Sequence, residues 1–407
     1  MPWWDGHTEI TDEMVRSTRK HLGSVRPLRN QWNTHISRDT LFHAAIGSGD
    51  DNPLWVDEDY AAKTRWGRRL APPSFIQSIT YGTRYPLDKP GLPGGSMLAG
   101  LPGIGSYWLG TDVTWFGPLR EGDEVRGHAS MIASIDSEGD QPGDRVDGIE
   151  DLAPVYTAWE RFVGSWTART MLQVGQCDIY REPQHELAVR VIEYGIRMPR
   201  GLPVEDGPYG SLAPASYSPE QIKEALATYA GLTRRGAEPR RLADLRAGEQ
   251  LSPAPRGPLS VTGMRAYGAA CGSNFAMGDA LLYRYLHDFP GANSPHEDTG
   301  VPDVPNRVHW DTDMARTLGM PRGYDFGPMR MFWFGSYVTD WAGDDAYLRR
   351  LRLLFPSPLF LWEMMSLRAD VAGTSVQEHG PTVSLTLTGE NERGVITTGS
   401  ADVVLAE

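Results

Sequence analysis

The chain has little cysteine, no excess of positive charge and no long apolar run. Its two thiols, Cys177 and Cys271, are too few for a disulfide framework in 407 residues and have no metal-ligand spacing. The net charge of −13 opposes a broad nucleic-acid or anionic-membrane surface. No apolar stretch is long enough to span a bilayer, and residues 1–6 are acidic and Trp-containing, unlike a secretory signal. These absences predict a cytoplasmic protein with no membrane or nucleic-acid partner and no metal.

Length and composition predict two domains. Hydrophobic residues make up 40% of the chain and charged residues 22%, which is typical of a soluble globular protein. A single ordinary core does not accommodate 407 residues, so two domains of similar size are expected.

One sequence pattern occurs twice. The first copy consists of Gly49, Asp50, Asp51, Asn52, Pro53, Leu54 and Trp55, then Asp57, Asp59, Ala61 and Gly67, then Ala71, Pro72, Pro73, Ser74 and Phe75. The second consists of Val308, His309 and Trp310, then Asp311, Asp313, Ala315 and Gly319, then Tyr324, Asp325, Phe326, Gly327 and Pro328. Trp55 and His309 occupy equivalent places, so the pattern predicts a duplicated fold in which only one half kept an acid/base group.

Each half begins with helices and ends with strands. In the first half, capping residues, prolines and apolar spacing predict helices at 12–21, 37–46, 58–66 and 72–81. Residues rich in β-branched and aromatic side chains predict strands at 106–116, 124–135, 156–166 and 170–180, the last two as a hairpin. This order is an α+β pattern.

The second half repeats that order after a linker. Residues 181–250 form the linker, with one helix at 218–231 that starts at a capping box. Helices follow at 262–270, 311–318 and 328–341, with an inserted loop at 273–307, and strands at 348–355, 363–372, 382–389 and 394–405. Because 328–341 is apolar nearly all round, it should be a buried central helix. The predicted domains are therefore 1–180 and 251–407.

The first copy resembles a known family. Gly49, Asp50, Asn52 and Pro53 resemble the Gly-Asp-x-Asn-Pro-x-His motif of (R)-specific enoyl-CoA hydratases and MaoC-like dehydratases. The segment 71–75 resembles the opening of the central helix in their fused members. The resemblance implies a double hotdog, in which each of two long helices is wrapped by a bent antiparallel sheet. It implies no cofactor beyond the coenzyme A or acyl-carrier phosphopantetheine that carries the acyl thioester, and leaves a homodimer open.

The sequence departs from the family where chemistry is expected. The family's His is Trp55 in the first half, and in the second half Gly272 and Ser273 stand in place of Gly-Asp, followed by the insertion before His309. In the family an Asp and a His share proton transfer, while a backbone N–H at the N-terminus of the hotdog helix stabilises the oxyanion. Helix N-termini suit this role because their first amides are unpaired and lie at the positive end of the dipole.

The second half meets these requirements better. Gly327 can present an N–H, whereas Pro72 and Pro73 have none. Trp55 does not exchange a proton near neutral pH, whereas the imidazole of His309 does. We therefore predict that the C-terminal domain is catalytic and that the N-terminal domain shapes the acyl tunnel.

The candidate residues follow from this assignment. The catalytic candidates are His309, Asp325 as its acid partner and Gly327, and the substrate-binding candidates are Tyr324, Arg330, Asp50, Asn52 and Trp55. Alternatives remain for several of them. Arg330 pairs either with Asp325 or with a cofactor phosphate, and Asp50 either reaches the site or braces the Asn52-Pro53 turn. Tyr324 either supplies a hydroxyl or packs. The cluster Arg349, Arg350 and Arg352 either meets coenzyme A or is solvated.

The leading functional hypothesis is a cofactor-independent hydro-lyase acting on 2-enoyl or 3-hydroxyacyl thioesters. A degenerate thioester-binding subunit is the second hypothesis, supported by the Ser that replaces the expected Asp. A hotdog thioesterase is the third, and the Asn-Pro motif disfavours it.

Overall fold

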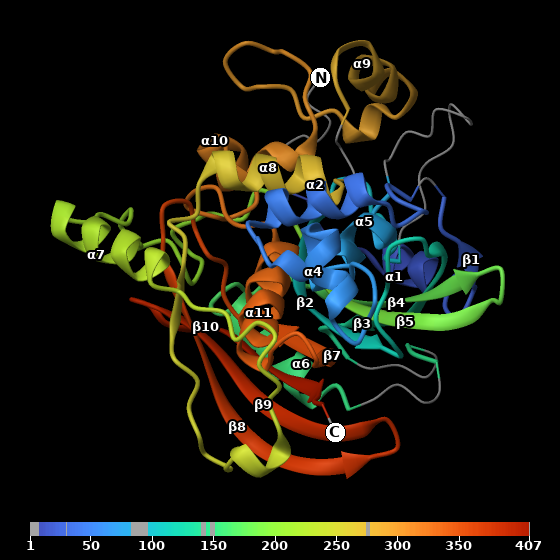
Figure 1. Cartoon of the computed structure of the whole chain (residues 1–407). Helices are drawn as coiled ribbons and strands as arrows, with labels where there is room; N and C mark the ends of the chain where they lie inside the picture. Colours follow the sequence, from blue (N-terminus) through green and yellow to red (C-terminus); the bar gives the residue numbers. More distant parts are fainter. Residues whose placement is uncertain are drawn as a thin grey trace.

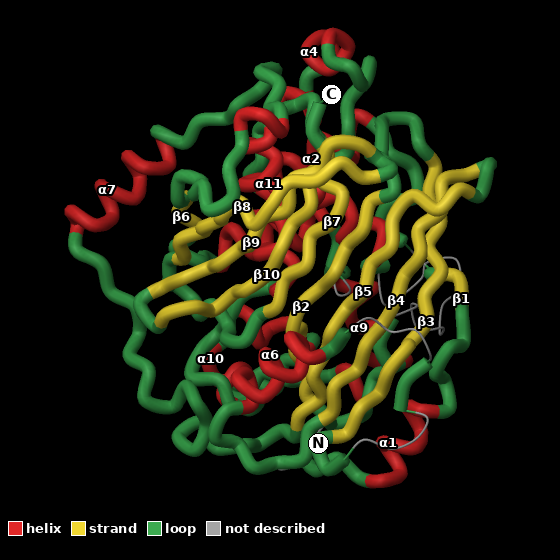
Figure 2. The backbone as a smooth tube through the Cα atoms, turned by 90° about the horizontal axis from the view of Figure 1, so that it is seen from below, coloured by secondary structure: helices red, strands yellow, loops and turns green. Residues whose placement is uncertain are grey.

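One continuous antiparallel sheet forms the base of the molecule (Figure 2). The computed structural model describes residues 8–29, 31–82, 97–139, 144–146, 151–273 and 277–406. Within them the strands are β1 (Arg26–Pro27), β2 (Gly105–Trp115), β3 (Glu124–Asp136), β4 (Met171–Glu182), β5 (Glu186–Met198), β6 (Ala254–Arg256), β7 (Tyr347–Leu354), β8 (Met365–Gln377), β9 (Gly380–Asn391) and β10 (Gly394–Val404). Their order is β1-β3-β4-β5-β2-β7-β10-β9-β8-β6.

This strand order is symmetric about the junction of β2 and β7. Outward from the junction, β2-β5-β4-β3-β1 on one side matches β7-β10-β9-β8-β6 on the other, with every neighbouring pair antiparallel. The junction itself pairs Gly110 with Leu354 and Thr114 with Arg350. The duplicated fold predicted from the repeated motif is thus confirmed at the level of topology.

The helices lie mostly over one face of this sheet (Figure 1). They are α1 (Asp12–Arg19), α2 (Arg38–Ser48), α3 (Pro53–Val56), α4 (Glu58–Lys63), α5 (Ile76–Thr80), α6 (Ala153–Val163), α7 (Pro219–Ala230), α8 (Val261–Cys271), α9 (Asp279–Asp288), α10 (Thr312–Arg316) and α11 (Gly327–Ala342). Short 3-10 turns are η1 (Pro73–Phe75), η2 (Leu242–Asp244), η3 (Pro290–Ala292) and η4 (Pro305–His309). No helix among the described residues is both long and apolar enough to cross a membrane.

The central helix of the second repeat is α11, as predicted. Phe334 and Val338 in it are fully buried, and it packs against β7, β8 and β2. Its counterpart in the first repeat is short, because η1 and α5 together cover only residues 73–80. The helices that precede the two motifs, α2 and α8, pack directly on each other, and Gly47 is needed there because a Cβ would overlap Ala270.

The strand predicted at 156–166 is wrong, because this segment is α6. Its aromatic and β-branched content suggested a strand. The buried positions Val155, Ala158, Trp159 and Phe162 instead follow helical spacing, with Pro154 in the first turn. The predicted hairpin is therefore also wrong.

The predicted boundary at residue 180 is too early. The hairpin partner of β4 is β5, a strand that lies inside the segment predicted as linker, and it pairs with both β4 and β2. The sheet of the first repeat therefore extends to Met198. The predicted linker helix is present as α7, with Ser218 and Gln221 forming the capping box.

Candidate functional site

A cavity of about 860 Å³ lies between the two repeats. It is bounded by the N-terminus of α11, by the end of η4, by β2 and β5, and by part of the insertion between α8 and η4. The lining residues include His309 and Gly327, together with Tyr324, Phe326, Tyr107 and Trp108. The structure therefore brings the predicted imidazole and the predicted oxyanion glycine to one cavity.

The ring of His309 has a fixed orientation. Its Nδ1 donates to the carbonyl oxygen of Tyr324 at 2.9 Å, and its ring centroid lies 4.0 Å from that of Phe326. A carbonyl only accepts, so Nδ1 carries the proton and Nε2 keeps the lone pair. Burial lowers the pKa of His309 to about 4, which keeps the ring neutral near pH 7. The neutral ring is the form that can accept a proton from a substrate.

The N-terminus of α11 has the features expected of an oxyanion site. No side chain caps it, and Pro328 in its first turn contributes no N–H. The first amide of this 16-residue helix therefore belongs to Gly327, which lines the cavity. At the equivalent position of the first repeat, Pro72 and Pro73 precede the short α5 and have no N–H to offer.

We expect Gly327→Ala to lower strongly the rate of any reaction that depends on this amide. A Cβ at this position would overlap the indole of Trp108, so the start of α11 or the ring must shift. Loss of one oxyanion donor typically costs ~10²–10³ in kcat. Steady-state kinetics on the folded variant check this, and Gly327→Ala combined with Trp108→Leu should recover part of the loss. A Gly327→Ala enzyme of undiminished kcat would contradict this expectation, because it would show that the site accommodates the Cβ without displacing the amide.

Asp325 and Arg330 form a buried ion pair. Arg330 Nε and Nη2 donate to the two carboxylate oxygens at 2.7 and 2.8 Å, and the side chains are 1% and 3% exposed for Arg330 and Asp325. Asp325 Oδ1 also accepts from Leu359 N at 2.9 Å. Of the two alternatives for Arg330, the structure shows the pairing with Asp325, and this contact gives no support to the predicted substrate-binding role. Because both oxygens of Asp325 accept hydrogen bonds, its contacts give no support to the predicted acid role.

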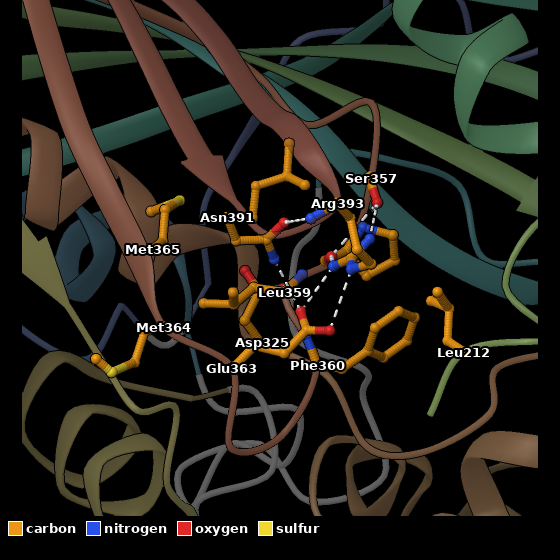
Figure 3. A network of polar contacts seen from close by, with 12 residues as sticks. Leu212, Asp325, Ser357, Leu359, Phe360, Glu363, Met364, Met365, Asn391 and Arg393 are labelled. Atoms are coloured by element: carbon orange, nitrogen blue, oxygen red, sulfur yellow. Dashed lines mark hydrogen bonds and ion pairs between the residues drawn. The ribbon is translucent and has the colours of Figure 1, made fainter. Parts of the chain in front are cut away.

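A second ion pair stabilises the loop whose Leu359 N–H donates to Asp325. Arg393 donates to both carboxylate oxygens of Glu363 at 3.1 and 2.7 Å and to Ser357 Oγ at 2.7 Å (Figure 3). Asn391 Nδ2 donates to Glu363 as well, at 3.1 Å. These contacts fix the loop from Ser357 to Glu363. The segment before α11 pairs with this loop through the antiparallel β-bridge between Tyr324 and Phe360.

The insertion interrupts the second motif rather than follows it. Asn306 Nδ2 donates to Ser273 Oγ at 3.5 Å, and both residues line the cavity. The spacing from Asn306 to His309 equals that from Asn52 to Trp55, so the insertion separates two parts of one sequence motif. Asn306 was missed in the sequence analysis, although this spacing was the signal that could have identified it.

The insertion borders the cavity. Tyr285 and Phe289, from α9 and just after it, are among the lining residues, as are residues 290–292 of η3. Tyr283, by contrast, is 48% exposed and is not a lining residue. The insertion therefore contributes to the shape of the site through α9, a helix in the segment predicted as a loop.

The first motif does not reach the cavity. Asp50 Oδ1 accepts from Asn52 N at 3.2 Å, and Asn52 Oδ1 accepts from Leu54 N at 2.9 Å. Trp55 packs in a separate apolar cluster with Leu54 and Leu70. None of the three predicted substrate-binding residues Asp50, Asn52 and Trp55 is among the described residues that line the cavity. This prediction is corrected: Asp50 braces the Asn-Pro turn, which was the alternative.

The stability of the chain should depend on the pH around Asp50. Burial raises the pKa of Asp50 from 3.8 to about 6, so the folded state favours the protonated acid. The stability from this group is therefore present below pH 4 and is lost as the pH rises through 6. In urea unfolding, Asp50→Asn should gain stability relative to the parent between pH 4 and pH 8. A hydrogen bond from Arg234 lowers the pKa of the neighbouring Asp51, so Asp51→Asn should instead lose stability relative to the parent as the pH rises. The same pH dependence in both variants would contradict the raised pKa of Asp50.

The arginine cluster is used within the protein. Arg350 Nε and Nη2 donate to the carboxylate of Asp112 at 2.9 and 2.6 Å, and Arg352 Nε lies 3.8 Å from the same carboxylate. Arg349 donates to the carbonyl oxygen of Trp115. These contacts join the two repeats across the β2–β7 junction, which gives the cluster a structural role in place of coenzyme A binding.

His296, Glu297 and Asp311 form a cluster with ligand atoms within 4.8 Å of one another. Arg307 Nη1 donates to Glu297 at 3.0 Å and to Asp311 at 2.7 Å. A guanidinium thus already pairs with both carboxylates, and the cluster is an ion-pair network that joins the insertion to the N-cap of α10.

Comparisons with known proteins agree with this geometry. Residues 26–147 match the family model for the FAS1-like dehydratase domain region. A solved structure described as a MaoC-like dehydratase is 12% identical, covers 96% of this chain and 100% of its own, and has a TM-score of 0.59. The chain has the double hotdog fold of MaoC-like dehydratases.

Two further solved structures cover most of this double hotdog chain. A double hotdog protein from Mycobacterium tuberculosis is 11% identical, covers 95% of the chain and 96% of its own, and has a TM-score of 0.49. A MaoC-like dehydratase from Phytophthora capsici is 14% identical, with 97% and 99% coverage and a TM-score of 0.47. The search of curated proteins found no match. In this double hotdog the sequence similarity to a dehydratase region falls on the first repeat, whereas the imidazole that lines the cavity belongs to the second.

Proposed function

We propose that the protein is a hydro-lyase that interconverts 2-enoyl and 3-hydroxyacyl thioesters, presented on coenzyme A or on an acyl carrier protein in the cytoplasm. One observation supports this above all: a neutral imidazole and a helix N-terminal amide line the same cavity. The dehydratase region matched in the first repeat agrees with this reaction class.

His309 and Gly327 divide the chemistry between them. In dehydration, Nε2 of His309 accepts the α-proton, and negative charge develops on the thioester oxygen, where the N–H of Gly327 stabilises it. The enolate then expels the β-hydroxyl, which takes the proton back from His309 and leaves as water. One imidazole thus serves both proton transfers, as is required where Ser273 replaces the family's acid. Ser273 and Asn306 are the neutral groups available to hold that water.

Tyr324 acts through both its backbone and its side chain. Its carbonyl oxygen sets the tautomer of His309, and its ring contacts that imidazole edge-on at 5.1 Å. Burial raises the pKa of Tyr324 well above its ordinary value, so the hydroxyl stays protonated and can donate to the substrate.

An assay with crotonyl-CoA and longer enoyl-CoAs tests the proposal. We expect loss of enoyl absorbance without release of free thiol. Thiol release would indicate the thioesterase, for which the cavity's buried carboxylate Asp325 is unsuited because Arg330 occupies it. Tight binding with neither reaction would favour the thioester-binding subunit, the alternative that the Ser at position 273 supports.

A further inference from the structure

The end of the cavity beneath α5 is polar. Glu193 on β5 and Gln77 on α5 both line it and are 5% and 6% exposed. Tyr81, directly after α5, hydrogen-bonds to Glu193. These residues come from the first repeat, whereas His309 and Gly327 come from the second. Glu193 lies two residues along β5 from Gly195, the pairing partner of Trp108. Trp108 lies beside Gly327, so the hydrogen-bonding end of the cavity is displaced from its reacting end.

The wall between these ends is apolar. Met97 packs over Gly175, which is the β4 partner of Glu193, and Leu98 packs over Gly195 on the same strand as Glu193. Trp108 and Phe355, with ring centroids 5.4 Å apart, line the cavity nearer Gly327. An acyl chain that runs along this wall from the thioester would direct its distal atoms toward Glu193 and Gln77.

A plain alkyl chain is a poor ligand for such an end. It offers no hydrogen-bonding atom to the buried carboxyl and the buried amide. A site built to hydrogen-bond a substrate oxygen rejects the analogue that lacks the oxygen far more strongly than an apolar pocket rejects a missing methylene. The lining therefore distinguishes acyl chains by the presence of a hydrogen-bonding substituent and not only by their length.

We propose that the acyl chain of the substrate carries an uncharged oxygen substituent, a hydroxyl or keto group, that is bound by Glu193 and Gln77 at the α5 end of the cavity. The inference rests on the proposed function, because it takes the thioester to lie at His309. It makes Glu193 and Gln77 specificity-determining residues with no part in proton transfer.

Charge favours an uncharged group over a carboxylate. Burial raises the pKa of Glu193 from 4.5 to about 7, so a second acid beside it would add like-charge repulsion. Arg197 lies on the same face of β5, four residues on and roughly 13 Å further along the strand. Its Nε is bonded to Gln173 Oε1 at 2.9 Å. A half-protonated carboxyl and an amide can each donate and accept, which suits a hydroxyl or a ketone.

The test compares trans-2-enoyl-CoA thioesters of increasing length, each with a methyl, a hydroxyl or a carboxylate at its end. At the best length, kcat/KM for the hydroxyl substrate should exceed that for the methyl substrate by ~10-fold or more, as expected for hydrogen bonds to buried groups. Glu193→Met and Gln77→Met should each bring this ratio close to one, whereas Glu193→Gln, which keeps hydrogen-bonding atoms, should preserve most of it. Crotonyl-CoA, too short to fill the far end, should be hydrated alike by all variants.

Binding separates this inference from the proposed function. Calorimetry with saturated acyl-CoA and ω-hydroxyacyl-CoA needs no reaction, and the same preference, lost in Glu193→Met, supports the inference even if no enoyl thioester is hydrated. Equal affinities in the parent, or a preference unchanged in both Met variants, would overturn it. A preference for the carboxylate ligand would also overturn it, in favour of recognition through Arg197. Unchanged thermal unfolding at pH 6 identifies which Met variants are folded.

Discussion

Replacing His309 with alanine should reduce kcat/KM for enoyl-CoA hydration by ~10²–10⁴, the usual contribution of a positioned general acid/base. The ring lines the cavity and is held by Tyr324 O, so its removal deletes the proton carrier and leaves the N–H of Gly327 in place. Progress curves of enoyl absorbance measure the rate. Because burial lowers the pKa of His309 to about 4, kcat/KM of the parent should be flat from neutral pH to about 5 and decline toward 4.

Trp55→Phe is the matched control for His309→Ala. Trp55 occupies the equivalent place in the first repeat, is 4% exposed and packs with Leu54 and Leu70 outside the cavity. Its variant should hydrate at close to the parental rate. A normal rate in His309→Ala, or an equal loss in both variants, would show that the imidazole does not carry the proton.

Breaking the pair of Asp325 and Arg330 should cost about 3–5 kcal/mol of unfolding free energy, because removing one partner leaves the other charge buried and uncompensated. Arg330 also donates from Nη1 to Ser357 O at 2.9 Å and Ile396 O at 2.8 Å, so the pair joins α11 to the β7–β8 loop and β10. Urea unfolding of Asp325→Asn and Arg330→Met measures the loss. The double variant should lose less than the sum of the two singles.

Glu390→Gln supplies the comparison for this pair. Its partner Arg368 and Glu390 itself have side chains 51% and 39% exposed, and exposed pairs contribute about 0–1 kcal/mol. The activity of Asp325→Asn decides between two roles. Lost stability with a largely retained rate in the folded enzyme fits a positioning residue. Retained stability with a rate ~100-fold lower would instead make Asp325 the acid predicted from sequence.

The repeated pattern identified two residues of the proposed site, whereas the prediction of individual strands was less successful. Comparing Trp55 with His309, and Pro73 with Gly327, located both ends of the proposed chemistry, because proton exchange and amide donation are properties of residue type. The segment 156–166 was predicted as a strand because of its aromatic content, although its buried residues have helical spacing. The strand β5 was not predicted because it lies in the segment assigned to the linker.

Contacts between distant segments were beyond reach from the sequence. Whether Asp325 faces His309 or Arg330 depends on a side-chain rotation and on the loop fixed by Arg393 and Glu363. The approach of Asn306 to Ser273 is a contact between residues 33 positions apart in the sequence. Glu193 belongs to no motif, and only the tertiary structure shows that it is buried beside the cavity.

The sequence by itself determined the duplication, the buried central helix of the second repeat and the half that carries an imidazole, because these follow from residue identity and local periodicity. Only the tertiary structure decided which acids are occupied by arginines, which copy of the motif faces a cavity and what lines its far end. Those properties depend on distances between segments far apart in the chain, and these distances are set when both repeats pack across the β2–β7 junction.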